Sequence, residues 1–242
     1  MSRTEPIRIN LWSGPRNIST ALLYSFAQRA DTRVLDEPLY DWYLQETDMQ
    51  HPGREDILNS MECDGQKVIA EQLMGTLDKP VLFAKQMTHH LLDLPKDFML
   101  AGKNVLLIRH PAKVLMSYSK VIDNPTLDDI GIRQSSELFE YLTAHQTHVY
   151  VADGDDILKD PATQLEKLCE ACSIAFDPAM LQWPAGKRPE DGVWARYWYD
   201  RVHRSTGFEP YAEKDVVLPE KLKGLAEEAM VYYRKLRFQS PG

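Results

Sequence analysis

The chain has 242 residues, 43% of them hydrophobic, which is enough for the core of one large domain or two small ones. Its formal net charge of −8 argues against nonspecific binding to nucleic acid. No apolar run reaches the roughly 18 residues of a membrane-spanning helix, and the first six residues lack the apolar segment of a signal peptide. An odd number of cysteines, three, is typical of a reducing compartment. We therefore expect a cytoplasmic protein that binds neither nucleic acid nor a membrane.

The first clear pattern runs from an apolar segment through a tight turn into an amphipathic segment. Residues Ile7–Trp12 are mostly apolar, the pair Gly14-Pro15 marks a turn, and apolar side chains then recur at helical spacing over Ile18–Phe26. This order predicts a strand, a loop and a helix. The free N–H groups and the dipole of a helix N-terminus favour anions, so the loop is a candidate anion site. Side chains that could contribute are the guanidinium of Arg16 and the hydroxyls of Ser19 and Thr20.

Strand patterns alternate with helical patterns along the rest of the chain. The further strands are expected at Val34–Leu35, Val81–Met87, Asn104–Ile108 and His148–Ala152. The further helices are expected at Val68–Leu77, Ala112–Val121, Asp128–Gln146, Pro161–Cys172 and Pro219–Leu236, with a loop and short helices over 41–63 and a long loop over 177–192. This alternation predicts a three-layer α/β fold with a doubly wound, mostly parallel sheet. No linker divides the chain, so we expect a single domain over residues 1–242.

A second candidate anion site follows the strand expected at Asn104–Ile108. Arg109 comes directly after that strand, Pro111 favours the start of a helix, and Ser117 lies eight residues beyond Arg109 on the same helix. A guanidinium at a strand end and a hydroxyl on the adjoining helix can bind one phosphate together. The two candidate sites would then lie at the tips of two strands and hold the two ends of one doubly phosphorylated ligand.

These two motifs, in this order, resemble the phosphate-binding motifs of the PAPS-dependent sulfotransferases. In that family the first loop binds the 5′-phosphosulfate, and Arg-x-Pro followed by Ser binds the 3′-phosphate. The resemblance implies a modified P-loop, the donor PAPS with its product PAP, no metal ion, and a hydroxyl or amine of a small-molecule or carbohydrate-like acceptor. Lys113 stands where many members carry Asp. The residues assigned to the nucleotide are Gly14, Pro15, Arg16, Asn17, Ser19, Thr20, Arg109 and Ser117, with Lys187 and Arg188 in a late basic loop.

The resemblance offers two candidates for the group that removes the acceptor's proton. Glu37, in Asp36-Glu37-Pro38-Leu39, is placed like the proposed base of the carbohydrate-type members. The cytosolic members use a His, but Met87 occupies the indicated position, and His89 and His90 come two and three residues later. We prefer Glu37 as the catalytic base, with His89 as the alternative. Glu37 could instead pair with a neighbouring Arg and only hold the loop.

Two other catalytic roles follow from the same resemblance, and two other functions stay open. Arg16 is expected to stabilise the leaving phosphate, and Lys85 to contact the bridging oxygen. The first alternative function is an ATP-dependent small-molecule kinase, although the loop lacks the second Gly and the Lys of the nucleotide triphosphate P-loop. The second is a nucleotide-binding module without catalysis. The acceptor and the oligomeric state are not indicated by any sequence feature.

Three further patterns are interpreted as structural. The pair Cys169 and Cys172 is expected on a buried helix face and not at a metal or redox site. The acidic stretch Asp153–Asp156 lacks the rest of a calcium-binding loop and is expected at a solvated strand end. The aromatic side chains of residues 194, 198 and 199 could stack on adenine or line the acceptor pocket, but such spacing more often reflects core packing.

Overall fold

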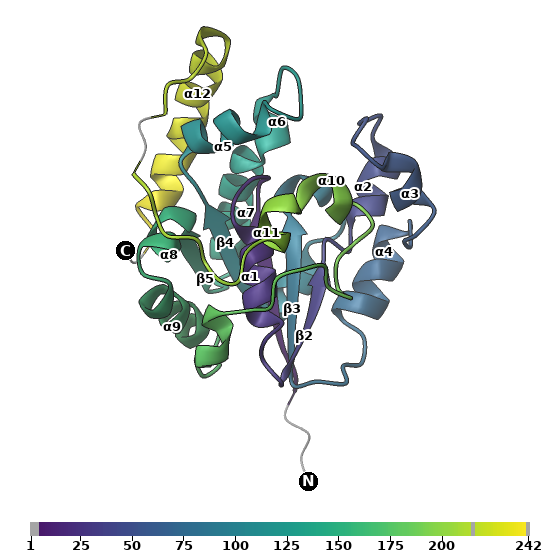
Figure 1. The fold of residues 1–242 in the computed structure, drawn as a ribbon. Helices are drawn as coiled ribbons and strands as arrows, with labels where there is room; N and C mark the ends of the chain where they lie inside the picture. Colours follow the sequence, from purple (N-terminus) through teal and green to yellow (C-terminus); the bar gives the residue numbers. More distant parts are fainter. Residues whose placement is uncertain (1–4, 214–215, 241–242) are drawn as a thin grey trace.

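The computed structural model describes residues 5–213 and 216–240 and is organised around a five-stranded sheet (Figure 1). The strands are β1 (Ile7–Ser13), β2 (Thr32–Asp36), β3 (Val81–Met87), β4 (Lys103–Ile108) and β5 (Val149–Asp153). All neighbours pair in parallel, in the order β2-β3-β1-β4-β5. The predicted fold class is therefore confirmed. Residues 1–4 lie outside the described residues. They are part of the N-terminal segment that is not expected to be a signal peptide.

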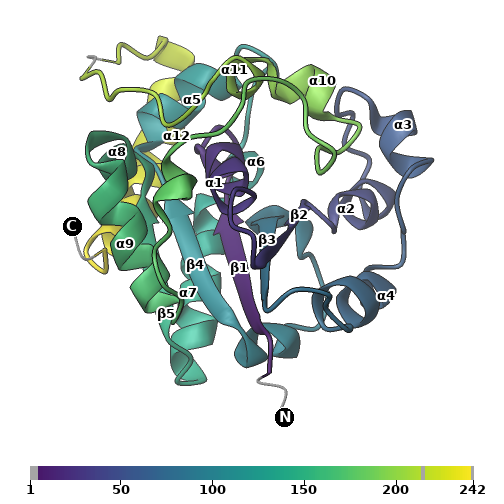
Figure 2. The ribbon, with the colours of Figure 1, turned by 60° about the horizontal axis from the view of Figure 1, so that its bottom comes forward.

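Helices cover both faces of the sheet, as Figure 2 shows from a second direction. One face carries α5 (Pro111–Tyr118), α7 (Ile132–Ala144) and α12 (Glu220–Arg237), and the other carries α1 (Ser19–Phe26), α8 (Gly154–Lys159) and α9 (Pro161–Ala171). The short helices in the connections are α2 (Tyr40–Glu46), α3 (Arg54–Leu58), α4 (Gly65–Val68), α6 (Leu127–Ile130), α10 (Ala195–Trp198), α11 (Asp200–His203), a π-helix (Ile69–Leu73) and 3-10 helices at Thr88–His90, Asp97–Ala101 and Pro178–Leu181. Within the described ranges, no helix combines the length and apolarity needed to cross a bilayer.

The central strands are apolar on both faces because both faces are covered by helices. In β4, Val105 and Leu107 pack in the cluster that contains α1 and α9, whereas Leu106 and Ile108 pack in the cluster that contains α5 and α7. A third, smaller cluster joins α2 and α3 to the segment around α10. This third cluster fastens the segment of α10 and α11 above the carboxyl ends of the strands (Figure 1).

Two predicted helices differ from the structure. The helix expected at Asp128–Gln146 is divided into α6 and α7 at Gly131, whose φ of 68° ends an α-helix, and α6 begins with a capping box at Thr126. The helix expected at Val68–Leu77 begins earlier, because the side chain of Asp64 caps α4, and it ends as the π-helix.

The acidic stretch after β5 is not a solvated strand end, and that prediction was wrong. Asp153 is only 3% exposed, and its carboxylate accepts hydrogen bonds from the backbone N–H of Asp155 (2.8 Å) and the hydroxyl of Tyr233 (2.7 Å). It caps α8 and connects it to α12, which sequence spacing does not reveal. Cys169 and Cys172 are buried against the core, as predicted.

Gly131→Ala is expected to destabilise the fold. Residue 131 has φ of 68°, and an added Cβ would lie 2.7 Å from Oγ1 of Thr88 and 3.3 Å from Cα of Gly14. We expect the free energy of unfolding to fall by about 1–3 kcal/mol in urea denaturation, because the backbone is strained and the neighbours must move. The control is Gly224→Ala on α12, where a Cβ meets nothing within 4 Å. It should raise the free energy of unfolding by about 0.5–1 kcal/mol. A loss of equal size in both variants would contradict this explanation.

Candidate active site

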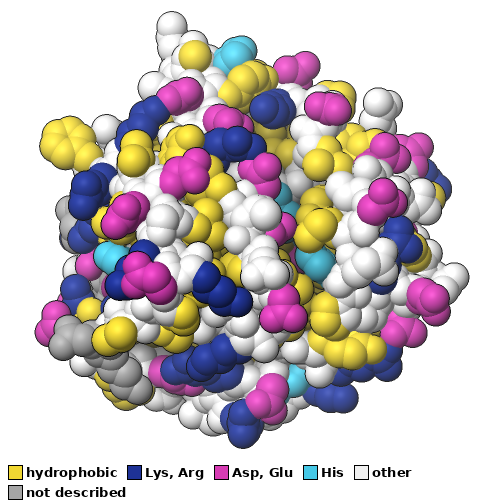
Figure 3. Space-filling model, turned by 90° about the horizontal axis from the view of Figure 1, so that it is seen from above, with side chains coloured by type: hydrophobic (Ala, Val, Ile, Leu, Met, Phe, Trp, Pro, Cys, Tyr) yellow, Lys and Arg dark blue, Asp and Glu magenta, His cyan; other side chains and the backbone are white. Residues whose placement is uncertain are grey.

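A cavity of about 460 Å³ lies at the carboxyl ends of the strands. The chain leaves β1 toward β2 on one side and reaches β4 on the other, so a crevice forms where the strand order changes direction. Its lining comes from the loop after β1, the ends of β2, β3 and β4, helix α5, residues between 194 and 212, and Val216. Figure 3 looks down on this edge of the sheet, where histidine side chains are visible among hydrophobic ones near the centre.

The loop between β1 and α1 has an unusual backbone. Arg16 (φ 58°) and Ile18 (φ 33°) both lie in the left-handed region, which non-glycine residues rarely adopt. The amide of Asn17 donates a hydrogen bond to the carbonyl oxygen of Leu107 (2.6 Å) and so ties the loop to β4. A Cβ on Gly14 would lie 2.0 Å from the carbonyl oxygen of Ile130, so only glycine fits there. The loop delivers the N-terminus of α1 to the cavity, with the side chains of Ser19 and Thr20 in its lining.

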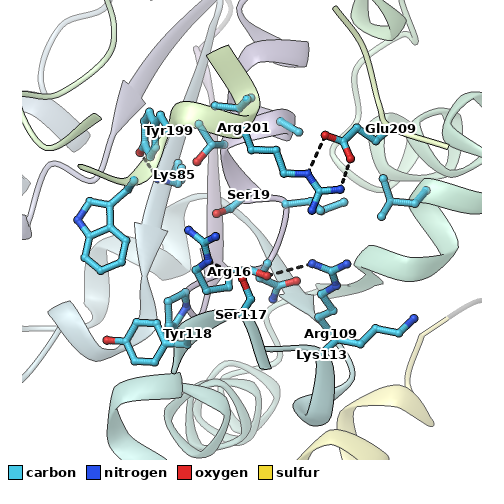
Figure 4. Close-up of a pocket in the computed structure, with 18 of the residues that line it drawn as sticks. Arg16, Ser19, Lys85, Arg109, Lys113, Ser117, Tyr118, Tyr199, Arg201 and Glu209 are labelled. Carbon is cyan, nitrogen blue, oxygen red and sulfur yellow. Dashed lines mark hydrogen bonds and ion pairs between the residues drawn. The ribbon is translucent and has the colours of Figure 1, made fainter. Parts of the chain in front are cut away.

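Three arginine side chains crowd the middle and one end of the cavity (Figure 4). Nε of Arg16 donates to Oγ of Ser117 (2.8 Å), and Arg109 donates to the backbone carbonyl of Arg16 (3.1 Å). Arg201, from α11, pairs with Glu209. Burial lowers the pKa of Arg16, and the charges of Arg201 and Arg109 lower it further. Within the described chain Arg16 has no acidic partner, so an anion with several oxygens would relieve this repulsion.

Beyond Arg109, a second group of charges closes this basic end. Asp155 accepts a hydrogen bond from Nε of Arg109 (3.4 Å) and another from the ammonium of Lys113 (2.6 Å). The ammonium of Lys113 also donates to the hydroxyl of Tyr211 (3.2 Å) and lies 4.7 Å from the centre of that ring. Lys113, whose role the sequence left open, therefore orients Asp155 and holds the segment that contains Tyr211 over the cavity.

The opposite end of the cavity contains a buried network around Lys85. Its ammonium, 1% exposed, donates to Asp36 (2.8 Å), Glu37 (2.5 Å) and the hydroxyl of Tyr199 (2.7 Å). Tyr199 in turn donates to Asp36 (2.7 Å) and accepts from the indole N–H of Trp194 (3.1 Å). The sequence-based expectation that Lys85 contacts the bridging oxygen does not match this arrangement, because all three ammonium protons already have protein acceptors.

Asp36 and Glu37 share the single ammonium of Lys85, and this arrangement shifts the pKa of Glu37. Burial raises the pKa of Glu37, Lys85 opposes that rise, and the charge of Asp36 adds to it, so the net shift is upward. Burial lowers the pKa of Lys85, but the two carboxylates more than compensate and keep it charged. Glu37 has φ of 44°, lines the cavity and is 8% exposed. It is therefore a carboxylate of increased basicity at the cavity wall.

Histidines and aromatic rings complete this end of the cavity. Burial lowers the pKa of His89 to about 3, with a further contribution from His51, and His90 is shifted down in the same way. The His90 ring stacks on Tyr40 and the Tyr118 ring on Trp198, with ring centres 4.7 Å and 6.4 Å apart. His51, His89 and His90 all line the cavity, and because their pKa values are lowered they are uncharged at neutral pH. In residues 5–213 and 216–240, no three His, Cys, Asp or Glu side chains are grouped so as to hold a metal ion.

Most of the site residues expected from the sequence line this one cavity. They are Pro15, Arg16, Asn17, Ser19, Thr20, Glu37, Lys85, His89, Arg109 and Ser117. Gly14 belongs to the same loop but is not part of the lining, and its Cβ position is blocked by the carbonyl oxygen of Ile130. The aromatic residues 194, 198 and 199 belong to the lining, and Trp194 and Tyr199 also belong to the third hydrophobic cluster.

Lys187 and Arg188 are the exception, because the structure places them away from the cavity lining. Neither is among the described residues that line the cavity. The guanidinium of Arg188 lies 4.7 Å from the centre of the Tyr24 ring. The carboxylate of Asp191 holds this turn against α1, because it accepts hydrogen bonds from the backbone N–H of Arg188 (2.9 Å) and the hydroxyl of Tyr24 (2.7 Å).

The structure adds two residues that the sequence analysis did not assign. Arg201 lines the cavity, and it lies 13 residues beyond Arg188, outside the motifs that the sequence analysis assigned. A search of the arginines that follow Arg188 in the sequence, Arg196, Arg201 and Arg204, could have identified Arg201 as a candidate. The aromatic stretch indicated Tyr199 as a possible lining residue, but no sequence signal indicated its hydrogen bonds, because its partners Lys85 and Asp36 are 114 and 163 residues away.

Comparison with known proteins assigns the chain to a family. The sequence model of the sulfotransferase domain matches residues 7–240. Two Arabidopsis thaliana proteins, named branched-chain-amino-acid aminotransferase-like proteins 1 and 2, are 40% and 38% identical over 234 and 230 residues, 96% and 95% of this chain. The chain spans only 42% and 41% of their lengths, so their names describe much longer proteins.

Solved structures share the fold at low sequence identity. The sulfotransferase domain of the Synechococcus PCC 7002 olefin synthase has a TM-score of 0.57 at 20% identity, over 94% of this chain and 96% of that one. Mouse sulfotransferase SULT7A1, complexed with PAP, has a TM-score of 0.56 at 13% identity, over 97% and 89%. These likenesses concern the fold, whereas the family match extends over almost the whole sequence. The chain belongs to the sulfotransferase domain family.

Proposed function

We propose that this domain transfers a sulfuryl group from PAPS to a hydroxyl, or an amine, of a small-molecule acceptor. The observation that carries the proposal is that an arginine cluster and a buried carboxylate line one cavity. The cluster fits a polyanionic donor, and the carboxylate fits the removal of an acceptor proton. Membership of the sulfotransferase domain family supports the same reaction.

The strand order supports an assignment of each end of the cavity. The loop that carries Arg16 follows β1, Arg109 follows the adjacent β4, and Glu37 follows β2, two strands away on the other side. With about 5 Å between neighbouring strands, the donor loop lies between a 3′-phosphate site and an acceptor site roughly 15 Å apart. We assign the 5′-phosphosulfate to the loop amides, Arg16, Ser19 and Thr20. We assign the 3′-phosphate to Arg109 and Ser117, with Arg201 above both.

The chemistry requires the acceptor to lose a proton while the donor's phosphate leaves with a negative charge. PAPS supplies the sulfuryl group and a 5′-phosphate leaving group. The acceptor oxygen forms a bond to sulfur as the bond from sulfur to the phosphate oxygen breaks, and PAP keeps that electron pair. Glu37 takes the proton. Arg16 and the N-terminus of α1 stabilise the charge that develops on the leaving phosphate.

Glu37 is a better base than His89 for this step. The pKa of Glu37 is raised by burial, so it binds a proton more readily than an ordinary glutamate. The pKa of His89 falls to about 3, which makes its imidazole a weak proton acceptor. Lys85 then acts on the base and not on the donor: its ammonium keeps Glu37 ionised until the acceptor's proton arrives.

Arg109→Ala should weaken PAP binding at least about tenfold, because a charged hydrogen-bond donor to the 3′-phosphate is lost. Isothermal titration calorimetry with PAP, ATP and AMP measures this, and ATP should bind far more weakly than PAP. The matched control is Arg188→Ala, whose side chain lies on Tyr24 outside the cavity and should not affect PAP binding. Tighter binding of ATP than of PAP would favour a kinase instead.

Glu37→Gln should abolish sulfuryl transfer while PAP still binds, because the amide cannot accept the proton at a useful rate. Transfer is followed with radiolabelled PAPS and a panel of phenols, alcohols and amines, and PAP affinity by calorimetry. Glu62→Gln, which changes an exposed ion pair with Lys67, is the control and should retain transfer. Wild-type turnover in Glu37→Gln would remove this residue from the mechanism, and loss in His89→Gln alone would assign the base to His89.

Lys85→Met should move the acidic side of the pH–activity profile to higher pH. The Lys85 charge lowers the pKa of Glu37, so its removal raises that pKa further and leaves the base protonated over a wider range. The profile of kcat/KM between about pH 5 and pH 9 measures the shift. Lys67→Met, on the surface, is the control. An unchanged acidic limb would mean that Lys85 does not act on the base.

A further inference from the structure

We propose that the acceptor is a small hydroxyl compound with a flat apolar ring and no negative charge, and that the end of the cavity around Glu37 discriminates against acidic acceptors and against acceptors without such a ring. This inference rests on the proposed function and names the acceptor class. We define the acceptor chamber as the lining formed by Glu37, Tyr40, His51, Met87, His89, His90, Tyr118, Trp194, Trp198 and Tyr199. The basic residues Arg109 and Lys113 lie at the other end, as Figure 4 shows.

The chamber has no free cation for an acidic acceptor. Its buried ammonium, Lys85, already pairs with two carboxylates, which leaves one formal negative charge. The three histidines are neutral at pH 7 because burial lowers their pKa. Asp129 adds to the negative potential, since its charge acts on His51 and Tyr118. A carboxylate or phosphate on the acceptor would meet repulsion that nothing in the chamber offsets.

The donor makes this repulsion stronger. Without a ligand, Arg16, Arg109 and Arg201 give the cavity positive charge. A bound polyanionic nucleotide would pair with these arginines and neutralise that charge, so it would no longer attract an acidic acceptor. Among the described residues of the lining, Lys113 is held by Asp155 at the basic end, and the cation left is Lys120, which is exposed just beyond α5. Lys120 is therefore the residue that must be tested as a rival means of attracting an acidic acceptor.

The wall of the chamber is largely aromatic. The hydroxyl of Tyr40 is bonded to Nδ1 of His51 (2.8 Å), and the hydroxyl of Tyr199 is occupied by Lys85, Asp36 and Trp194. A flat apolar ring would pack on Tyr40, Tyr118 and the two tryptophans, and would present one hydroxyl to Glu37. A sugar ring has no flat apolar face of this kind and would gain less from the aromatic wall.

In the reaction of such an acceptor, its single hydroxyl oxygen bonds to sulfur as the bond between sulfur and the leaving phosphate oxygen breaks. The hydroxyl proton passes to Glu37, and PAP departs with the electron pair. A phenol meets both requirements, because its ring fills the chamber and its hydroxyl loses the proton more easily than an aliphatic alcohol does.

The test compares acceptors of matched shape and different charge on the wild-type protein. Para-cresol (neutral), tyramine (cationic) and para-hydroxyphenylacetate (anionic) share one phenol group, and methyl glucoside represents an acceptor without a flat apolar ring. We expect kcat/KM for cresol and tyramine to exceed the values for the acid and the glucoside by at least about tenfold. Equal or higher kcat/KM for the acid or the glucoside would overturn the proposal.

Two variants identify the origin of the discrimination. Trp198→Lys places an ammonium in the chamber wall and should reduce the disadvantage of the acid to within about threefold of cresol. Lys120→Ala should leave the order of acceptors unchanged. Selective loss of turnover of the acid in Lys120→Ala would show that Lys120 recruits acidic acceptors and would overturn the proposal. Because the wild-type comparison decides alone, a misfolded Trp198→Lys protein does not leave the proposal untested.

A binding measurement separates failure of this inference from failure of the proposed function. Calorimetry first establishes whether PAP binds, and absence of PAP binding counts against the sulfotransferase assignment itself. The complex with PAP is then titrated with cresol and with para-hydroxyphenylacetate, and quenching of tryptophan fluorescence reports occupancy of the chamber. PAP binding combined with equal or tighter binding of the acid would overturn the acceptor class while the donor assignment stands.

Discussion

A single buried ammonium group holds together three parts of this protein that are distant in sequence. Lys85, at the end of β3, bonds to Asp36 and Glu37 after β2 and to Tyr199 in the segment above the cavity. Two buried carboxylates without this cation would repel each other and lose solvation. The same ammonium therefore positions the proposed base and attaches the segment that carries Arg201. The carboxyl ends of the strands and the segment above them form one site because of this network.

Charge is separated along the edge of the sheet in the order of the strands. The carboxylates follow β2, the donor loop follows β1 in the centre, and Arg109 follows β4. The strained backbone at Arg16 and Ile18 and the close contact of Gly14 with Ile130 keep the central loop in one conformation between the two ends. A cavity with an acidic, aromatic end and a basic end suits two substrates that meet in the middle, one uncharged and one polyanionic.

The sequence was sufficient for the features that depend on local patterns. Buried parallel strands are nearly continuous apolar runs, so the run before Arg109 predicted β4 and the position of the arginine after it. The turn at Gly14 and the helical spacing after Ile18 predicted the loop and α1 in the same way. Parallel strands end at a common edge of the sheet, so the alternation of strands and helices was enough to predict that Arg16, Glu37 and Arg109 lie near one another. In the structure all three line one cavity.

Only the tertiary structure decided which polar groups face one another. Whether Lys85 points to a donor or to carboxylates depends on the segment above it, and Tyr199 approaches from more than a hundred residues away. The same holds for Arg188, which lies on Tyr24 of α1 because Asp191 holds its turn there, whereas Arg201 lines the cavity. Sequence by itself determined the sheet, the loop after β1 and the strand-end residues, since these follow from local patterns. The partners of each side chain came from packing between distant segments, for which no local pattern exists.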